Sequence, residues 1–136
     1  MTPVPGIFER SVKSAIENVS AADASGVIVY RFGASLYFAN ANLFMEEVER
    51  LLTQDPTPVR AFVLDAEAIA DIDTTGAEVL HQVLKLFADR QVTFAIARAN
   101  PQLPPLLQRY HLLPLIGENR LYPTNRHAVA ALRQEQ

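Results

Sequence analysis

The sequence predicts an α/β fold with a small β-sheet that is mostly parallel or mixed. Three observations lead to this prediction. Short apolar runs alternate with stretches of helical periodicity along most of the chain. The run at 61–64 is continuously apolar, as is typical of a central strand covered on both faces. Strands that alternate with helices of ten to fifteen residues form parallel sheets through right-handed crossovers.

Bulk composition places the chain among ordinary soluble proteins. It has 136 residues, 49% of them hydrophobic and 20% charged, and a net charge of −3, so one domain with a real core is expected. Lysine and arginine are scattered, which argues against a nucleic-acid partner. The chain lacks cysteine, which excludes disulfides, thiol catalysis and thiolate metal sites. No apolar stretch reaches the roughly 20 residues of a membrane span, so we expect no direct membrane insertion by this segment.

Residues 1–25 are expected to be a linker-like lead-in, because they carry no clear strand signal. At most a helical turn or two is expected over 8–19. The folded domain should cover 26–133, and 134–136 should be a short tail. The expected strands are 27–32, 36–38, 61–65, 92–97 and 121–122.

Four helices are expected between and after these strands. Asn40 or Asn42 should cap the first, and the prolines after Asp55 should end it. The helices at 75–89, after Pro104, and after Thr124 or Asn125 complete the series. Their predicted core faces carry Phe44, Val48, Leu51 and Leu52; Leu80, Val83, Leu84 and Phe87; Leu106, Leu107 and Tyr110; and Val129, Ala130 and Leu132. The outer face of the first helix should carry Glu46, Glu47, Glu49 and Arg50.

The turn between the strand at 61–65 and the following helix is the main candidate for a functional site. It ends in Asp73, Thr74, Thr75 and Gly76. The spacing of Thr75 and Glu78 fits a capping box, which would place two hydroxyl groups at a helix N-terminus. Ligands and partners of α/β sheets usually bind at such turns.

Several motifs together resemble the STAS domain of SulP-type anion transporters and of bacterial anti-sigma factor antagonists. The segment 26–44 (GVIVYRFGASLYFANANLF) is similar to the opening strand pair and first helix of the SulP branch, and 36–41 is its most specific part. The segment 62–80 (FVLDAEAIADIDTTGAEVL) is similar to the central strand and acidic loop. The resemblance implies a stack of βα units, like a superhelix, around a small sheet.

The resemblance also implies a role. SulP proteins carry this domain on the cytoplasmic side of the membrane, after the last membrane span. The chain is therefore expected to be a regulatory, non-catalytic part of a sulfate or related anion transporter. Its partner would be the membrane-spanning part or another cytoplasmic protein, and a homodimer is compatible with it. Only the family likeness suggests a bound nucleotide, and no motif in the sequence supports it. We therefore expect no cofactor. The alternatives are a stand-alone phospho-switch protein of the antagonist type and a nucleotide-sensing module.

Two interpretations of the acidic loop stay open in the sequence. Thr75 matches the family position that is phosphorylated in the antagonists, yet the same residue can serve as a plain helix cap. Asp65, Glu67, Asp71 and Asp73 could gather as metal ligands, but a solvated acidic rim is the expected arrangement. We expect Glu67, Asp71 and Glu78 to contribute to an interaction surface.

No catalytic or metal site is predicted. The three histidines (His81, His111 and His127) are far apart in sequence, and His81 is expected on the surface. No serine or threonine lies in a nucleophile-elbow motif, and the five glycines form no phosphate-binding loop. The apolar segments 36–38 and 112–116 are expected to pack in the core, although the second could also mark an interface.

Overall fold

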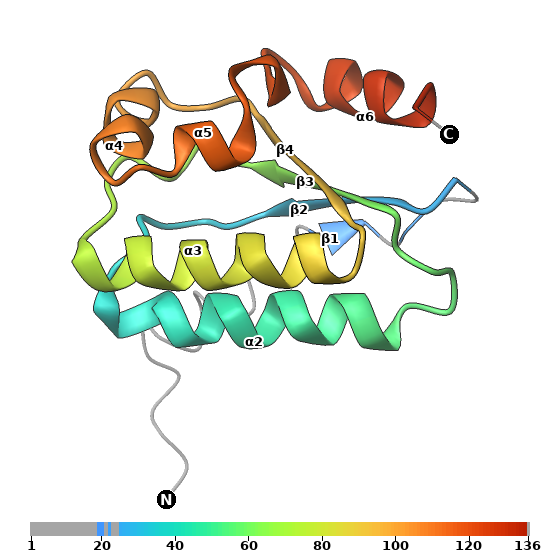
Figure 1. Cartoon of the computed structure of the whole chain (residues 1–136), viewed down its shortest axis with the longest axis horizontal. Helices are drawn as coiled ribbons and strands as arrows, with labels where there is room; N and C mark the ends of the chain where they lie inside the picture. Colours follow the sequence, from blue (N-terminus) through green and yellow to red (C-terminus); the bar gives the residue numbers. More distant parts are fainter. Residues whose placement is uncertain (1–18, 21, 23–24, 136) are drawn as a thin grey trace, which may run out of the picture.

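The computed structural model describes residues 19–20, 22 and 25–135. Its strands form one sheet in the order β1-β2-β3-β4-β5 (Figure 1). Their bounds are β1 Val19–Ser20, β2 Val27–Arg31, β3 Ala61–Asp65, β4 Thr93–Ala97 and β5 Leu121–Tyr122. β1 is antiparallel to β2, and the other neighbours are parallel. The predicted α/β class and the strands at 27–32, 61–65 and 92–97 are thereby confirmed.

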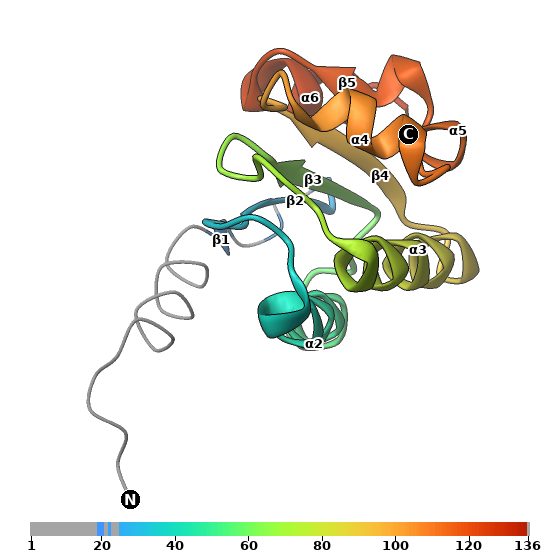
Figure 2. The same ribbon diagram turned by 90° about the vertical axis from the view of Figure 1, so that its left-hand side faces the viewer.

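Two helices cover one face of this sheet and a third covers the other. α2 (Phe38–Gln54) and α3 (Thr74–Asp89) lie side by side, as Figure 2 shows end-on. α6 (Asn125–Arg133) packs on the opposite face, against β2, β3 and β4. Between β4 and β5 the chain forms α4 (Leu103–Arg109), α5 (Leu113–Ile116) and the 3-10 helix η1 (Glu118–Arg120). Among the described residues, no helix is long and apolar enough to cross a membrane.

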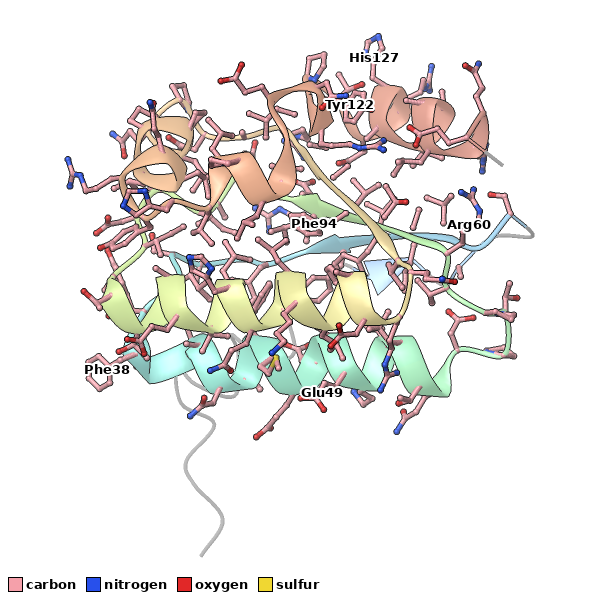
Figure 3. The ribbon with its side chains drawn as sticks, in the orientation of Figure 1. Phe38, Glu49, Arg60, Phe94, Tyr122 and His127 are labelled. Carbon is pink, nitrogen blue, oxygen red and sulfur yellow. The ribbon has the colours of Figure 1, made fainter. Side chains whose placement is uncertain are left out.

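The larger core lies between the sheet and the α2–α3 pair. The face of α3 predicted to be buried, including Leu80 and Val83, is indeed buried. The ring of Phe94 on β4 (Figure 3) stacks on that of Phe87, with 5.4 Å between the centroids. Its centroid lies 6.4 Å from that of the Phe62 ring. Under α6 the sheet carries mostly small side chains, which lets this short helix approach closely through its own buried residues. That smaller cluster consists of Val27, Ala61, Val63, Ala95, Ala97, Ala128 and Leu132.

The predicted strand at 36–38 is wrong. Leu36 makes a single parallel bridge to Ile72, and α2 begins two residues later at Phe38. Asn40 and Asn42 are also not its N-cap, because Tyr37 holds that position and its N–H donates to Asn40 Oδ1 at 2.9 Å. Three consecutive apolar residues carry no periodicity that separates a short strand from a helix start.

Glu47 was expected on the outer face of α2 but is buried, with 4% of its surface exposed. Its Oε1 accepts a hydrogen bond of 3.0 Å from the hydroxyl of Tyr30 on β2. Burial raises the pKa of the Glu47 carboxyl, although the Tyr30 bond and nearby Arg50 oppose the shift. Burial, followed by the Glu47 charge, also raises the pKa of Tyr30. The pair is therefore a polar contact inside the main core.

The chain ends hold contacts that the sequence did not suggest. β1 lies within the segment expected to be a lead-in, whereas the helical turns expected over 8–19 fall almost wholly outside the described residues. The Ala22 N–H donates to Asp55 Oδ2 at 2.9 Å, tying this segment to the end of α2. At the other end, Glu135 forms an ion pair with Arg120 through both carboxylate oxygens. This pairing lowers the pKa of Glu135.

Candidate contact surface at the carboxyl edge of the sheet

The expected site residues lie where β2 and β3 end and α2 and α3 begin. β2, β3 and β4 pair in level register, from Val27, Ala61 and Thr93 to Arg31, Asp65 and Ala97. Because the strands are parallel, the connections to both helices leave from the same edge of the sheet (Figure 1). Ligands and partners of such sheets commonly bind outside this edge.

Asp73 holds the N-termini of both helices. It is the N-cap of α3, and its Oδ1 accepts the N–H of Gly76 at 2.7 Å. Its Oδ2 accepts the N–H of Phe38, the first residue of α2, at 2.9 Å. A carboxylate at this position satisfies otherwise unpaired N–H groups and faces the positive end of each helix dipole. Asp73 is thus a structural residue of the site.

The prediction that Thr75 caps α3 is wrong. The helix starts at Thr74, which makes Thr75 the second helical residue and leaves no capping box with Glu78. Aspartate caps at least as well as threonine, so the aspartate two residues earlier takes the position. The side chains of Thr74, Thr75 and Glu78 are exposed on the first turns of α3.

Gly76 marks a close approach between the two connections. A Cβ atom at this position would lie 2.1 Å from the carbonyl oxygen of Leu36. The same oxygen accepts the N–H of Asp73 at 3.2 Å, and the Leu36 N–H donates to the Asp71 carbonyl at 3.0 Å. Only glycine leaves room for this contact. The segment before α2 is therefore held against the acidic loop by backbone hydrogen bonds.

Two aromatic residues expected in the core lie on this surface instead. Phe38 is 73% exposed, and its ring points outward from the N-terminal end of α2 (Figure 3). Tyr37 is also exposed, and its hydroxyl donates to Asp71 Oδ2 at 2.8 Å, which is the main reason why its pKa is raised. Leu36 alone of this segment is buried. Consecutive side chains at a helix start point in different directions, so one of three can face the core while the others face solvent.

The carboxylates of the acidic loop do not form one solvated rim. Asp65 is buried, with 2% exposed, and accepts hydrogen bonds from Arg98 Nη1 at 3.0 Å and from Asn125 Nδ2 at 3.1 Å. Glu67 is paired with Arg31 and Arg98, whereas Asp71 pairs with Tyr37. Within the described ranges, no three His, Asp or Glu side chains gather as metal ligands. The sequence could not show these arginine partners, since they lie at the ends of other strands.

His81 and the 112–116 segment also differ from expectation. His81 is half-buried on α3, and its Nε2 lies 3.2 Å from the Tyr110 carbonyl oxygen. Leu112 and Ile116 are buried as expected, but Leu115 is 59% exposed. None of these residues belongs to the edge where α2 and α3 begin.

Sequence comparison assigns this chain to a known family: residues 18–128 match the STAS domain. The chain belongs to the STAS domain family. A probable sulfate transporter of Mycobacterium tuberculosis is 38% identical over 109 residues, which cover 80% of this chain and 20% of that protein. Sulfate transporter 1.3 of Arabidopsis thaliana is 28% identical over 112 residues, 76% of this chain and 17% of that protein. The STAS chain thus spans about a fifth of these relatives.

Solved structures support the same fold. The SulP transporter STAS domain from Vibrio cholerae superposes with a TM-score of 0.67 at 24% identity, covering 94% of this chain and 96% of that one. A putative anti-sigma factor antagonist from Thermotoga maritima reaches 0.69 at 20% identity, covering 85% and 92%. Both branches of the family named by the sequence motifs therefore share this architecture.

Proposed function

We propose that the chain is the regulatory, non-catalytic STAS domain of a SulP-type sulfate or anion transporter. It acts on the cytoplasmic side of the membrane, by contact with the membrane-spanning part or with another cytoplasmic protein. The observation that carries the proposal is the 38% identity to one fifth of a probable sulfate transporter. The 109 aligned residues have the size of one domain.

The contact surface consists of Phe38, Tyr37, Asp71, Thr75 and Glu78 in our proposal. Protein interfaces commonly centre on an aromatic anchor surrounded by polar residues. Phe38 is the most exposed large hydrophobic side chain of the described residues, and the loop beside it carries the carboxylates. The partner surface should therefore offer an apolar pocket bordered by lysine or arginine.

A chimeric transporter tests this function. The chain would replace the aligned fifth of the M. tuberculosis sulfate transporter, and sulfate uptake would be measured in cells. Phe38→Ala combined with Glu78→Lys should reduce uptake several-fold, because both changes alter the proposed surface. Glu49→Lys on the outer face of α2 is the matched control and should leave uptake unchanged. Full uptake by the first variant, at equal membrane levels, would remove this surface from function.

A phospho-switch with Thr75 as acceptor is the second candidate. Its support is that Asp73 performs the capping, which leaves the Thr75 side chain exposed on the first turn of α3. A phosphate there would lie near the positive end of the α3 dipole, although Asp71 and Glu78 would repel it. Mass spectrometry of the protein from its native host tests this candidate. A phosphorylated Thr75 that disappears in Thr75→Val supports the switch, and its absence under all growth conditions rejects it.

A further inference from the structure

Two arginines converge on one carboxylate at the ends of three neighbouring strands. Arg31 is the last residue of β2, Arg98 directly follows β4, and Glu67 lies just after β3. Arg31 Nη2 lies 3.3 Å from Glu67 Oε1, and Arg98 Nη2 pairs with Glu67 Oε2. The level register of the strands brings these groups together, although more than thirty residues separate each from the next.

The Arg98 guanidinium is held in a fixed position. Its backbone has a φ of 56°, a left-handed conformation that non-glycine residues rarely adopt. The Arg98 N–H donates to the Tyr122 carbonyl at 3.0 Å, and the side chain is anchored on buried Asp65. Surrounding contacts must stabilise this conformation, which Gln91 and His111 also adopt.

A neighbouring acceptor is left unpaired. Asn125 binds Asp65 through Nδ2, while its Oδ1 is buried and accepts no hydrogen bond from the described residues. Buried polar atoms normally have a partner. Only a hydrogen-bond donor such as a water molecule can satisfy this oxygen beside the Asp65–Arg98 pair, because an oxyanion without protons offers acceptors alone.

Of the four charged groups, Glu67 is the one that can leave. Asp65 is buried, whereas the Glu67 side chain is 52% exposed, more than either arginine. Two positive and two negative charges balance in this arrangement, so an incoming anion has to replace Glu67. The two guanidinium groups would then face the anion instead of the carboxylate.

We propose that Arg31 and Arg98 form a binding site for a small divalent oxyanion of the sulfate type, and that Glu67 occupies this site in its absence. Guanidinium groups present N–H donors in a planar fork that suits the oxygen atoms of such anions. Binding involves no bond change, only the exchange of one anionic partner for another. The site lets the domain respond to oxyanion concentration through the loop that continues to Asp71, a consequence that rests on the proposed function.

Titration of the 136-residue chain with sodium sulfate tests the site, followed by amide NMR shifts against sodium chloride at equal ionic strength. Sulfate should give saturable shifts around Arg31, Glu67 and Arg98 that chloride does not give. Glu67→Gln should bind sulfate about tenfold more tightly, because two exposed ion pairs no longer compete. Arg98→Gln should weaken sulfate binding at least tenfold. If the Arg98→Gln variant does not fold, Arg31→Gln gives the same test.

Arg126→Gln, on an exposed position of α6, is the matched control and should bind sulfate like the wild type. The opposite signs at Glu67 and Arg98 separate a site from a structural ion pair, whose removal would not tighten binding. Sulfate shifts no larger than those of chloride in both the wild type and Glu67→Gln would overturn the proposal. So would equal losses in Arg98→Gln and Arg126→Gln, which indicate general charge effects only. These results do not bear on the proposed contact with the transporter, because that contact is tested separately by sulfate uptake.

Discussion

At the scale of single residues, Asp73 links the two helices that border the proposed contact surface. Its two oxygens accept the N–H groups of Gly76 and Phe38. Asp73→Ala removes the N-cap of α3 and the acceptor of the first N–H of α2, so it should lower the free energy of unfolding by about 2 kcal/mol, since one such hydrogen bond at a helix start contributes about 1 kcal/mol. Urea unfolding of the purified chain measures this loss.

Thr75→Ala is the matched control for the Asp73 variant. Thr75 is exposed and is not the cap, so its loss should change stability by less than about 0.5 kcal/mol. The reverse order of the two effects would mean that the helix starts at the threonine after all. A functional test of the loop should therefore use Asp71 or Glu78, because changes at Asp73 mix function with stability.

Glu47 gives the domain a pH-dependent stability. Its raised pKa means that the folded chain holds a proton that the unfolded chain releases, in the window between the ordinary carboxyl pKa of 4.5 and the higher folded pKa. Stability should thus fall as the pH rises through this window. Glu47→Gln keeps an acceptor for Tyr30 but carries no charge, so it should be the more stable protein at pH 8 and equal the wild type near pH 4.

Urea unfolding at several pH values checks this trend. Glu49→Gln on the exposed side of the same helix should follow the wild type at every pH. Tyr30→Phe should destabilise the chain by about 1–3 kcal/mol at neutral pH, because it leaves the buried carboxylate without its donor. A stability difference between Glu47→Gln and the wild type that does not vary with pH would contradict the buried-charge explanation.

At the scale of elements, α2 carries aromatic residues with opposite roles. Phe44 is fully buried, 5.2 Å from the ring of Phe32, whereas Phe38 is exposed at the helix start. Phe44→Ala should therefore cost about 3–5 kcal/mol of stability. Phe38→Ala should be within about 0.5 kcal/mol of the wild type, since it removes no core contact. Thermal or urea unfolding compares the two, and a large loss in Phe38→Ala would place that ring in the core.

The longer helices and the central strands could be predicted because their signals are periodic or continuous, whereas the short α5 and η1 were not predicted. The α3 face and the β3 run left no other reasonable interpretation. Helix starts were less accessible, as the shift from Thr75 to Asp73 and from Asn40 to Tyr37 shows. Both caps depend on contacts between the two connections, including the approach of Leu36 to Gly76, which no local pattern contains.

At the scale of the whole molecule, the site could be predicted only in part. The turn at residues 73–76 was accessible, because the structure places it between β3 and α3 as the sequence predicts. The side-chain partners were not, because Arg31, Asp65 and Arg98 meet only when three strands pair in level register. Phe38 was assigned to the core because hydrophobicity alone does not tell inside from outside at a helix terminus.

Site-specific photo-cross-linking tests the proposed contact most directly. A photoreactive amino acid would replace Phe38 in the protein expressed in its native host, and His127 on α6 would carry it in a parallel control (Figure 3). Position 38 should cross-link to peptides of a membrane-spanning sulfate or anion transporter sequence, within the same polypeptide or in another one. Position 127 should not. Cross-links to such a sequence from position 127 but none from position 38 would contradict the contact surface proposed for this domain.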